Sequence, residues 1–276
     1  MPLELKPVSP AIGIEIAGLD VSKPLDGATF GRVRQAWLEG QILLLRGQDL
    51  DEAVQAAFAA RFGPLAGVLN RHDGAGRHPG VMYVSNIVEN GKLIGALPDG
   101  EMYFHSDQCY VERPAMATML YAMEIPSRGG NTLFANMHRA YDALPHSVKQ
   151  RLEGRKALNV YDYRNSATTR GAAVADDSPR CAHPVFRTHP DTGRKAVYVN
   201  RLMTRSIEGL PQTESNELLE LLFDHCERAE FVYEHRWTPG DLILWDNRCT
   251  LHARTDFDAS ERRKLRRVAV LGEVPV

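Results

Sequence analysis

The chain is poor in cysteine and has no long apolar run. Its four cysteines, among 276 residues, are scattered and form no Cys-x-x-Cys pair, so we expect reduced thiols rather than a disulfide framework. No segment approaches the roughly 18 to 20 apolar residues that a membrane helix needs, and the first residues lack the basic and apolar regions of a signal peptide. We therefore expect a cytoplasmic protein with no membrane partner.

An excess of charge of one sign is also absent. Thirty-three Lys and Arg stand against 35 Asp and Glu, which leaves a formal net charge of -2. A chain without a basic field has no general attraction to nucleic acid, so we expect small-molecule partners instead. The hydrophobic share of 43% and the charged share of 25% are ordinary for a globular protein.

Local patterns predict a mainly β protein with flanking helices. The periodicity predicts helices over 29–39, 50–62, 137–144, 147–153 and 214–228. It predicts strands over 12–16, 42–45, 81–88, 115–123, 132–135, 185–188, 196–199, 231–237, 241–246 and 264–271. Short strands with few helices between them favour an antiparallel sandwich or barrel. No linker separates two units, so we expect residues 1–276 to form a single domain.

Two loop-rich segments are candidates for lids. Residues 65–100 are rich in Gly, Pro and Asn, and residues 164–180 hold almost no large apolar side chain. Long loops in compact domains often cover a binding site.

His105 and Asp107 stand two residues apart, so an extended backbone points both side chains to one face. His252 lies far downstream at the end of an apolar segment, where a buried structural histidine is the alternative interpretation. Together these residues supply two imidazoles and one carboxylate, a set that leaves three positions open on an octahedral Fe(II). Open positions are what oxygen chemistry requires.

A basic run extends from Arg262 to Arg267 and could be a solvated stretch or a nucleic-acid patch. In a strand, however, Arg263 and Arg267 share one face while Lys264 and Arg266 share the other. Two guanidinium groups in one cavity would suit a dicarboxylate cosubstrate or an anionic substrate, because the guanidinium fork binds carboxylates in a bidentate way.

Four motifs are taken together: His105-x-Asp107, Gly129-Gly130-Asn131-Thr132, Trp245-Asp246-Asn247-Arg248 with His252, and Arg263 with Arg267. In combination they resemble the iron(II) and 2-oxoglutarate-dependent dioxygenases of the taurine dioxygenase and 2,4-dichlorophenoxyacetate dioxygenase family. The resemblance covers nearly the whole chain, and the segment 231–237 with Gly240-Asp241 is most similar to the phenoxyacetate type. The resemblance implies a double-stranded β-helix core of the jelly-roll, cupin-like kind, with lid insertions.

The same resemblance implies a role for each motif residue. His105, Asp107 and His252 would bind Fe(II), and Thr132 with Arg263 would hold the distal carboxylate of 2-oxoglutarate. Arg267 would contact the cosubstrate or the anionic end of the substrate. With O2, the reaction would release succinate and CO2 and hydroxylate a substrate carbon. Relatives commonly form dimers or tetramers, so we expect a homo-oligomer.

The sequence is compatible with two classes of substrate. We favour a small anionic molecule of the aryloxyalkanoate kind, and the alternative is a sulfonate or sulfate ester. Glu101 would repel a sulfonate if it faced the pocket, or it is simply exposed in the lid. Arg71 and His72 are candidates for binding an anionic substrate group, and Cys109 could line the pocket, although packing alone would explain this thiol.

Two other classes compete with the dioxygenase. A zinc hydrolase could use the same three ligands with a bound water, but this function gives no role to the two inward arginines. A non-catalytic, cupin-like binding protein would keep the fold without the metal, and the intact set of three ligands argues against it.

Overall fold

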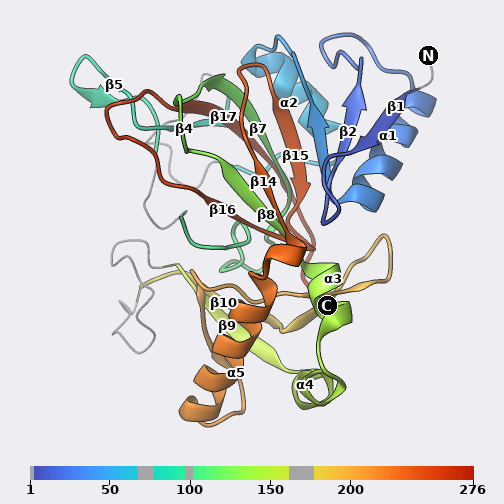
Figure 1. Ribbon diagram of the computed structural model, residues 1–276, viewed down its shortest axis with the longest axis vertical. Coiled ribbons are helices and arrows are strands. Elements are labelled where there is room, and N and C mark those ends of the chain that lie inside the picture. The colour runs from blue at the N-terminus through green and yellow to red at the C-terminus, as the bar shows by residue number, and fades with distance from the viewer. Residues whose placement is uncertain (1–2, 68–77, 97–101, 162–176) are drawn as a thin grey trace.

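The computed structural model describes residues 3–67, 78–96, 102–161 and 177–276 (Figure 1). Its larger sheet contains, in spatial order, β1 (Glu4–Pro7), β2 (Ile14–Ala17), β3 (Ile42–Leu45), β15 (Leu242–Asp246), β7 (Ala115–Glu124), β17 (Lys264–Leu271) and β4 (Val81–Ser85). All neighbours in this sheet are antiparallel except β2 and β3. The central strands thus come from distant parts of the chain.

A smaller sheet faces the inner side of the larger one. It consists of β14 (Val232–His235), β8 (Thr132–Asn136) and β16 (Thr250–Arg254), with β8 in the middle. One apolar cluster joins Phe134 of the smaller sheet to Leu120, Ile243 and Leu265 of the larger sheet. The two sheets therefore form a sandwich whose interior is filled from both sides.

Two helices cover the outer face of the larger sheet, α1 (Gly27–Gly40) and α2 (Glu52–Ala60) (Figure 1). Each begins after an aspartate, Asp26 or Asp51, whose carboxylate accepts a hydrogen bond from a backbone N–H of the first turn. Strand β3 is buried on both faces because alternate leucines pack under the helices and between the sheets. This explains its continuous apolar sequence.

A second group of elements packs below the sandwich as Figure 1 is drawn. It comprises α3 (Met137–Ala143), α4 (His146–Leu152), β9 (Lys156–Val160), β10 (Arg180–Pro184), β11 (Phe186–Thr188), β12 (Lys195–Val197), β13 (Thr204–Ile207), α5 (Gln212–Cys226) and the 3-10 helix η3 (Ala229–Phe231). One apolar cluster runs from α5 through β12 to Leu251 on β16. This core ties the group to the smaller sheet.

The prediction of a mainly β protein with flanking helices is confirmed, with differences in detail. All five predicted helices are present, and each end lies within two residues of its predicted position. The strand predicted over 81–88 ends at Ser85, and Val88 belongs to a separate short hairpin of β5 (Val88–Glu89) and β6 (Lys92–Leu93). Strands β1, β6, β9, β10, β13 and β16 were not predicted from the sequence. Most of these strands mix polar and apolar residues without a clear period, and β16 pairs with β8, which is distant in the sequence.

The two lid candidates are only partly described. Residues 65–67, 78–96 and 177–180 are placed, whereas 68–77, 97–100 and 164–176 lie outside the described residues. Within the ranges that the structure describes, no helix combines the length and the apolar character needed to cross a membrane.

Candidate active site

His105 and His252 meet at the edge of the smaller sheet. They form an isolated antiparallel bridge in which each backbone N–H donates to the other residue's carbonyl at 2.9 Å. Their ring centroids are 4.1 Å apart. Two histidines that are distant in sequence are thus paired directly by backbone hydrogen bonds.

Asp107 completes a group of three possible metal ligands. Its Oδ1 lies 4.0 Å from Nε2 of His252, and one ligand atom from each of the three residues lies within 4.8 Å of the others. Metal bonds to nitrogen and oxygen are about 2.0–2.2 Å long, so atoms that share an ion lie at most about 4.4 Å apart. The three side chains are therefore close to the arrangement that a shared ion needs.

The second carboxylate oxygen of Asp107 is held by the protein. Oδ2 accepts a hydrogen bond from Oγ1 of Thr118 and forms an ion pair with Nη2 of Arg267 at 2.9 Å. Burial alone would raise the pKa of Asp107, but the charge of Arg267, the two imidazoles and the Thr118 hydroxyl outweigh it and hold the pKa well below its usual range. The carboxylate is therefore ionised and oriented.

Both imidazoles offer a lone pair. Nδ1 of His105 lies 2.8 Å from the Tyr103 carbonyl, which can only accept a hydrogen bond, so Nδ1 carries the proton. Nε2 therefore keeps the lone pair that can bind a metal ion. Burial lowers the pKa of His252 to about 3, assisted by the neighbouring His105 and Arg267. Two neutral imidazoles and one carboxylate are the protonation states in which these side chains bind a divalent ion.

A hydrogen-bonded chain that was not predicted from the sequence lies behind Asp107. Trp245 donates from Nε1 to Oδ1 of Asn247 at 2.8 Å, and Asn247 donates from Nδ2 to Oγ1 of Thr118 at 2.9 Å. The Trp245 ring also lies 4.7 Å from the His252 ring. The signal in the sequence was the Trp-Asp-Asn-Arg motif, but only the pairing of Trp245 with Thr118 identifies the threonine.

Thr132, Arg263 and Arg267 line one pocket together with the three candidate ligands. Arg263 donates from Nε to the Gly130 carbonyl at 3.1 Å. Thr132 accepts from Nε1 of Trp237 at 3.0 Å. Arg266 lies on the opposite face of the strand, where Nε donates to Oε1 of Gln55 at 2.7 Å. The predicted alternation of the arginines is confirmed.

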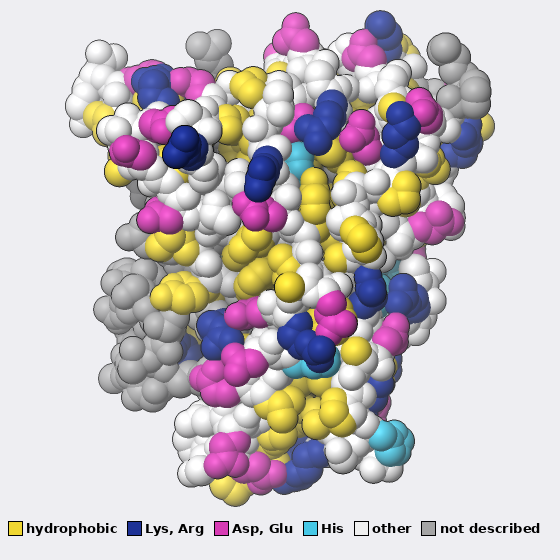
Figure 2. Space-filling model, viewed as in Figure 1, with side chains coloured by type: hydrophobic (Ala, Val, Ile, Leu, Met, Phe, Trp, Pro, Cys, Tyr) yellow, Lys and Arg dark blue, Asp and Glu magenta, His cyan; other side chains and the backbone are white. Residues whose placement is uncertain are grey.

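The rest of the basic run does not form an exposed stripe. Arg262 is exposed but pairs with Glu124, and the Lys264 ammonium lies over the Tyr83 ring. Figure 2 shows cationic and anionic side chains intermingled on the face that it presents. The run is thus divided between the pocket, the core and a paired surface.

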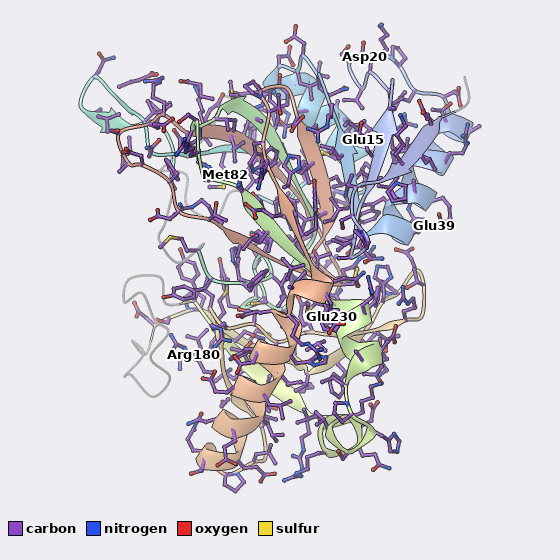
Figure 3. All side chains as sticks on the ribbon, in the orientation of Figure 1. Glu15, Asp20, Glu39, Met82, Arg180 and Glu230 are labelled. Atoms are coloured by element: carbon purple, nitrogen blue, oxygen red, sulfur yellow. The ribbon has the colours of Figure 1, made fainter. Side chains whose placement is uncertain are left out.

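Met82 on β4 adds a contact at the arginine end of the pocket. Nη1 of Arg267 lies 3.6 Å from its sulfur, and Met82 is labelled on the ribbon in Figure 3. The Arg267 guanidinium is thereby fixed between β4 and Asp107.

Of the four other substrate candidates from the sequence, Cys109 alone belongs to the described residues. Arg71, His72 and Glu101 lie outside the described residues. Cys109 lies in a separate apolar cluster with Tyr110, Tyr198 and Met203 rather than among the residues lining the pocket. Burial raises the pKa of its thiol to about 12. The packing interpretation of Cys109 therefore fits the structure.

A second group of His, Asp and Cys donors is a structural network. His189, Asp246 and Cys249 are buried close together. Both Asp246 oxygens accept hydrogen bonds from Arg248, and Oδ2 also lies 2.9 Å from Nε2 of His189. Burial raises the pKa of the Cys249 thiol well above its ordinary value. The Asp246 carboxylate is already occupied by hydrogen bonds and the Cys249 thiol is protonated, so this group offers few ligand atoms to a metal ion.

A β sandwich that encloses two imidazoles and one carboxylate has the donor set of the non-haem Fe(II) oxygenases. The model of the taurine catabolism dioxygenase TauD, TfdA family matches residues 4–269. The chain is 33% identical to the alpha-ketoglutarate-dependent 2,4-dichlorophenoxyacetate dioxygenase of Cupriavidus pinatubonensis over 100% of both chains. It is 32% identical to the alpha-ketoglutarate-dependent sulfate ester dioxygenase of Pseudomonas putida, over 99% of this chain and 91% of the relative.

A solved structure shows the same similarity. The crystal structure of a taurine dioxygenase from Burkholderia xenovorans matches with a TM-score of 0.85 and 29% identity, covering 99% of this chain and 91% of that one. The chain belongs to the TauD, TfdA family. It is an α-ketoglutarate-dependent dioxygenase, and the enzymes of this class use Fe(II), 2-oxoglutarate (α-ketoglutarate) and O2.

Proposed function

We propose that His105, Asp107 and His252 bind the Fe(II) ion and that Thr132 and Arg263 bind the distal carboxylate of 2-oxoglutarate. The observation that carries this proposal is the convergence of the three ligands, the threonine and two arginines on one pocket. A zinc hydrolase would have no use for the paired arginines, and a binding protein without metal would have none for the three ligands. In this proposal the two facing sheets are the jelly-roll core, and residues 1–276 form one catalytic domain.

The residues around the metal site prepare it for chemistry. When bound, Fe(II) with 2-oxoglutarate supplies the oxidant that hydroxylates a C–H bond, with release of succinate and CO2. Thr118 and Arg267 hold Asp107 through Oδ2, so Oδ1 stays available as a ligand. Val84, Leu120 and Trp245 line the pocket with apolar surface. Such a lining excludes water and strengthens the electrostatic contacts.

Arg267 has a second role in this proposal, as a cationic group beside the substrate position. Its side chain keeps 17% of its surface exposed, which leaves part of the guanidinium accessible from the pocket. A guanidinium in this position favours an anionic substrate. Aryloxyalkanoates are the favoured class, supported by the relative that acts on 2,4-dichlorophenoxyacetate. A sulfonate or a sulfate ester is the alternative, and the Pseudomonas relative supports the sulfate ester.

A substrate panel tests the function. Aryloxyacetates, aryloxypropionates, alkylsulfonates and alkyl sulfate esters are incubated with Fe(II), 2-oxoglutarate and O2, and substrate-dependent succinate is measured. We expect release with at least one anionic class and none with Asp107→Ala. Anaerobic addition of Fe(II) and 2-oxoglutarate should also give a weak visible charge-transfer band. Failure to bind 2-oxoglutarate in the presence of Fe(II) would contradict the residue assignment.

A further inference from the structure

Arg254 occupies a position beside the proposed cosubstrate site. It is the last residue of β16 and lies two residues after His252, so both side chains point to the same face of the sheet. The antiparallel register pairs Arg254 directly with Thr132 on β8. Residues paired in this way have neighbouring side chains on one face. Arg254 therefore stands next to the threonine proposed to bind the distal carboxylate.

Arg254 is buried, and the described part of the chain gives its guanidinium no counter-charge. The residue is 7% exposed, and among the described residues it forms no ion pair with a carboxylate. Its Nε is buried and has no hydrogen-bond partner in the described part of the chain. Its Nη1 reaches only the Thr255 carbonyl, at 3.4 Å. The guanidinium carbon lies 5.4 Å from the centre of the Phe257 ring.

Burying such a guanidinium costs free energy unless a bound ligand pairs with it. A buried cation is stable when it is paired and its N–H groups are hydrogen-bonded. Arg254 lines the same pocket as Thr132 and Arg263. It also borders a neighbouring hollow with Asn86 and Phe257. An anion at this end of the pocket would provide the missing partner.

We propose that Arg254 is a third cosubstrate-binding residue, which donates to the distal carboxylate of 2-oxoglutarate together with Thr132 and Arg263. A carboxylate accepts about four hydrogen bonds, so it can serve one hydroxyl and two guanidinium groups. The inference rests on the proposed function, because it requires 2-oxoglutarate to lie with its distal end at Thr132. It assigns to Arg254 a contact that the motif residues alone do not include.

The test compares two 2-oxo acids by calorimetry on the Fe(II)-loaded protein without oxygen. 2-Oxoglutarate carries the distal carboxylate, and 2-oxobutanoate has the same 2-oxo acid head without it. We expect Arg254→Met to weaken 2-oxoglutarate binding about tenfold or more, as for the loss of a charge-assisted hydrogen bond. Binding of 2-oxobutanoate should stay unchanged, and Arg254→Lys should give an intermediate loss for 2-oxoglutarate alone.

The controls separate this inference from the proposed function. Arg262→Met removes an exposed arginine that pairs with Glu124 and should leave both affinities unchanged. Equal affinities of Arg254→Met and the wild type for 2-oxoglutarate would overturn the role of Arg254, as would an equal loss for both acids. If Arg254→Met does not fold, the Arg254→Lys comparison decides by the same criterion. A wild-type protein that binds both acids equally would instead contradict the assignment of the distal site as a whole.

Discussion

Arg267 forms an ion pair with Oδ2 of Asp107 at 2.9 Å, while Oδ1 of the same carboxylate is the atom that lies 4.0 Å from Nε2 of His252. The arginine therefore determines which oxygen is available to a metal ion. It also helps to hold the pKa of Asp107 well below its ordinary value, against the effect of burial. One side chain thus orients the carboxylate and keeps it ionised.

Replacing Asp107 by alanine should abolish both metal binding and catalysis. The substitution removes the only carboxylate among the three candidate ligands, and two imidazoles alone bind a divalent ion weakly. Mn(II) binding followed by electron paramagnetic resonance measures the first effect, and succinate release measures the second. Asp191→Ala is the control, since this aspartate pairs with Arg34 and Arg248 away from the pocket. Unchanged Mn(II) affinity in Asp107→Ala would show that the ion binds elsewhere.

Thr118→Val should weaken metal binding without removing a ligand. The valine deletes the hydroxyl that donates to Asp107 and accepts from Asn247. Loss of such supporting contacts typically reduces metal affinity about 10- to 100-fold. Thr204→Val is the matched control, because Thr204 is a buried threonine whose hydroxyl donates to Asn159 outside the pocket. Both variants should lose about 1–3 kcal/mol of unfolding free energy, but only Thr118→Val should change the Mn(II) dissociation constant.

Arg263→Met should raise the concentration of 2-oxoglutarate needed for half-maximal rate by about tenfold or more, with a smaller change in the maximal rate. Arg263 is 1% exposed and lines the pocket, so its loss acts at the site. Arg266→Met is the control for losing a buried arginine from the same strand, because Arg266 lies on the opposite face against Gln55. It should lower stability and leave 2-oxoglutarate saturation unaltered. If the two variants saturate alike, the arginines have been assigned to the wrong faces.

His138 should make the protein less stable in mild acid. Burial lowers its pKa to about 4 from an ordinary value near 6.5. Between these values the unfolded chain binds more protons, so stability falls as the pH decreases from about 6.5 to 4 and changes no further below. We expect His138 to account for about 1–2 kcal/mol of loss between pH 7 and pH 5.

The matching variants are His138→Asn and His146→Asn, compared by urea unfolding at both pH values. Asparagine at position 138 keeps an N–H that can replace Nδ1 as a donor to the Lys195 carbonyl. It should reduce the drop in stability between pH 7 and pH 5. His146 is exposed at the start of α4, and its replacement should leave the drop as it is in the wild type. An equal drop in all three proteins would rule out His138 as its source.

The strands and helices that were predicted correctly have strong local periods. Strand β3 is a run of four apolar residues, and α1 and α2 begin after aspartate caps. The strands that were missed contain charged or polar residues, and some of them owe their pairing to distant partners. Strand β16 is an example, because Thr250–Arg254 is extended only where it can pair with β8. Local propensity is a weak guide where tertiary pairing decides.

By itself, the sequence determined which side chains share a face. The alternation of an extended chain pairs His105 with Asp107, and Arg263 with Arg267, whatever surrounds them. Only the tertiary structure decided which faces meet. The bridge between His105 and His252, the place of Thr118 behind Asp107 and the pairing of Arg254 with Thr132 all depend on the register between distant strands. A shift of one residue would turn every side chain to the other face, and that register is set by the packing of the whole core rather than by any local pattern.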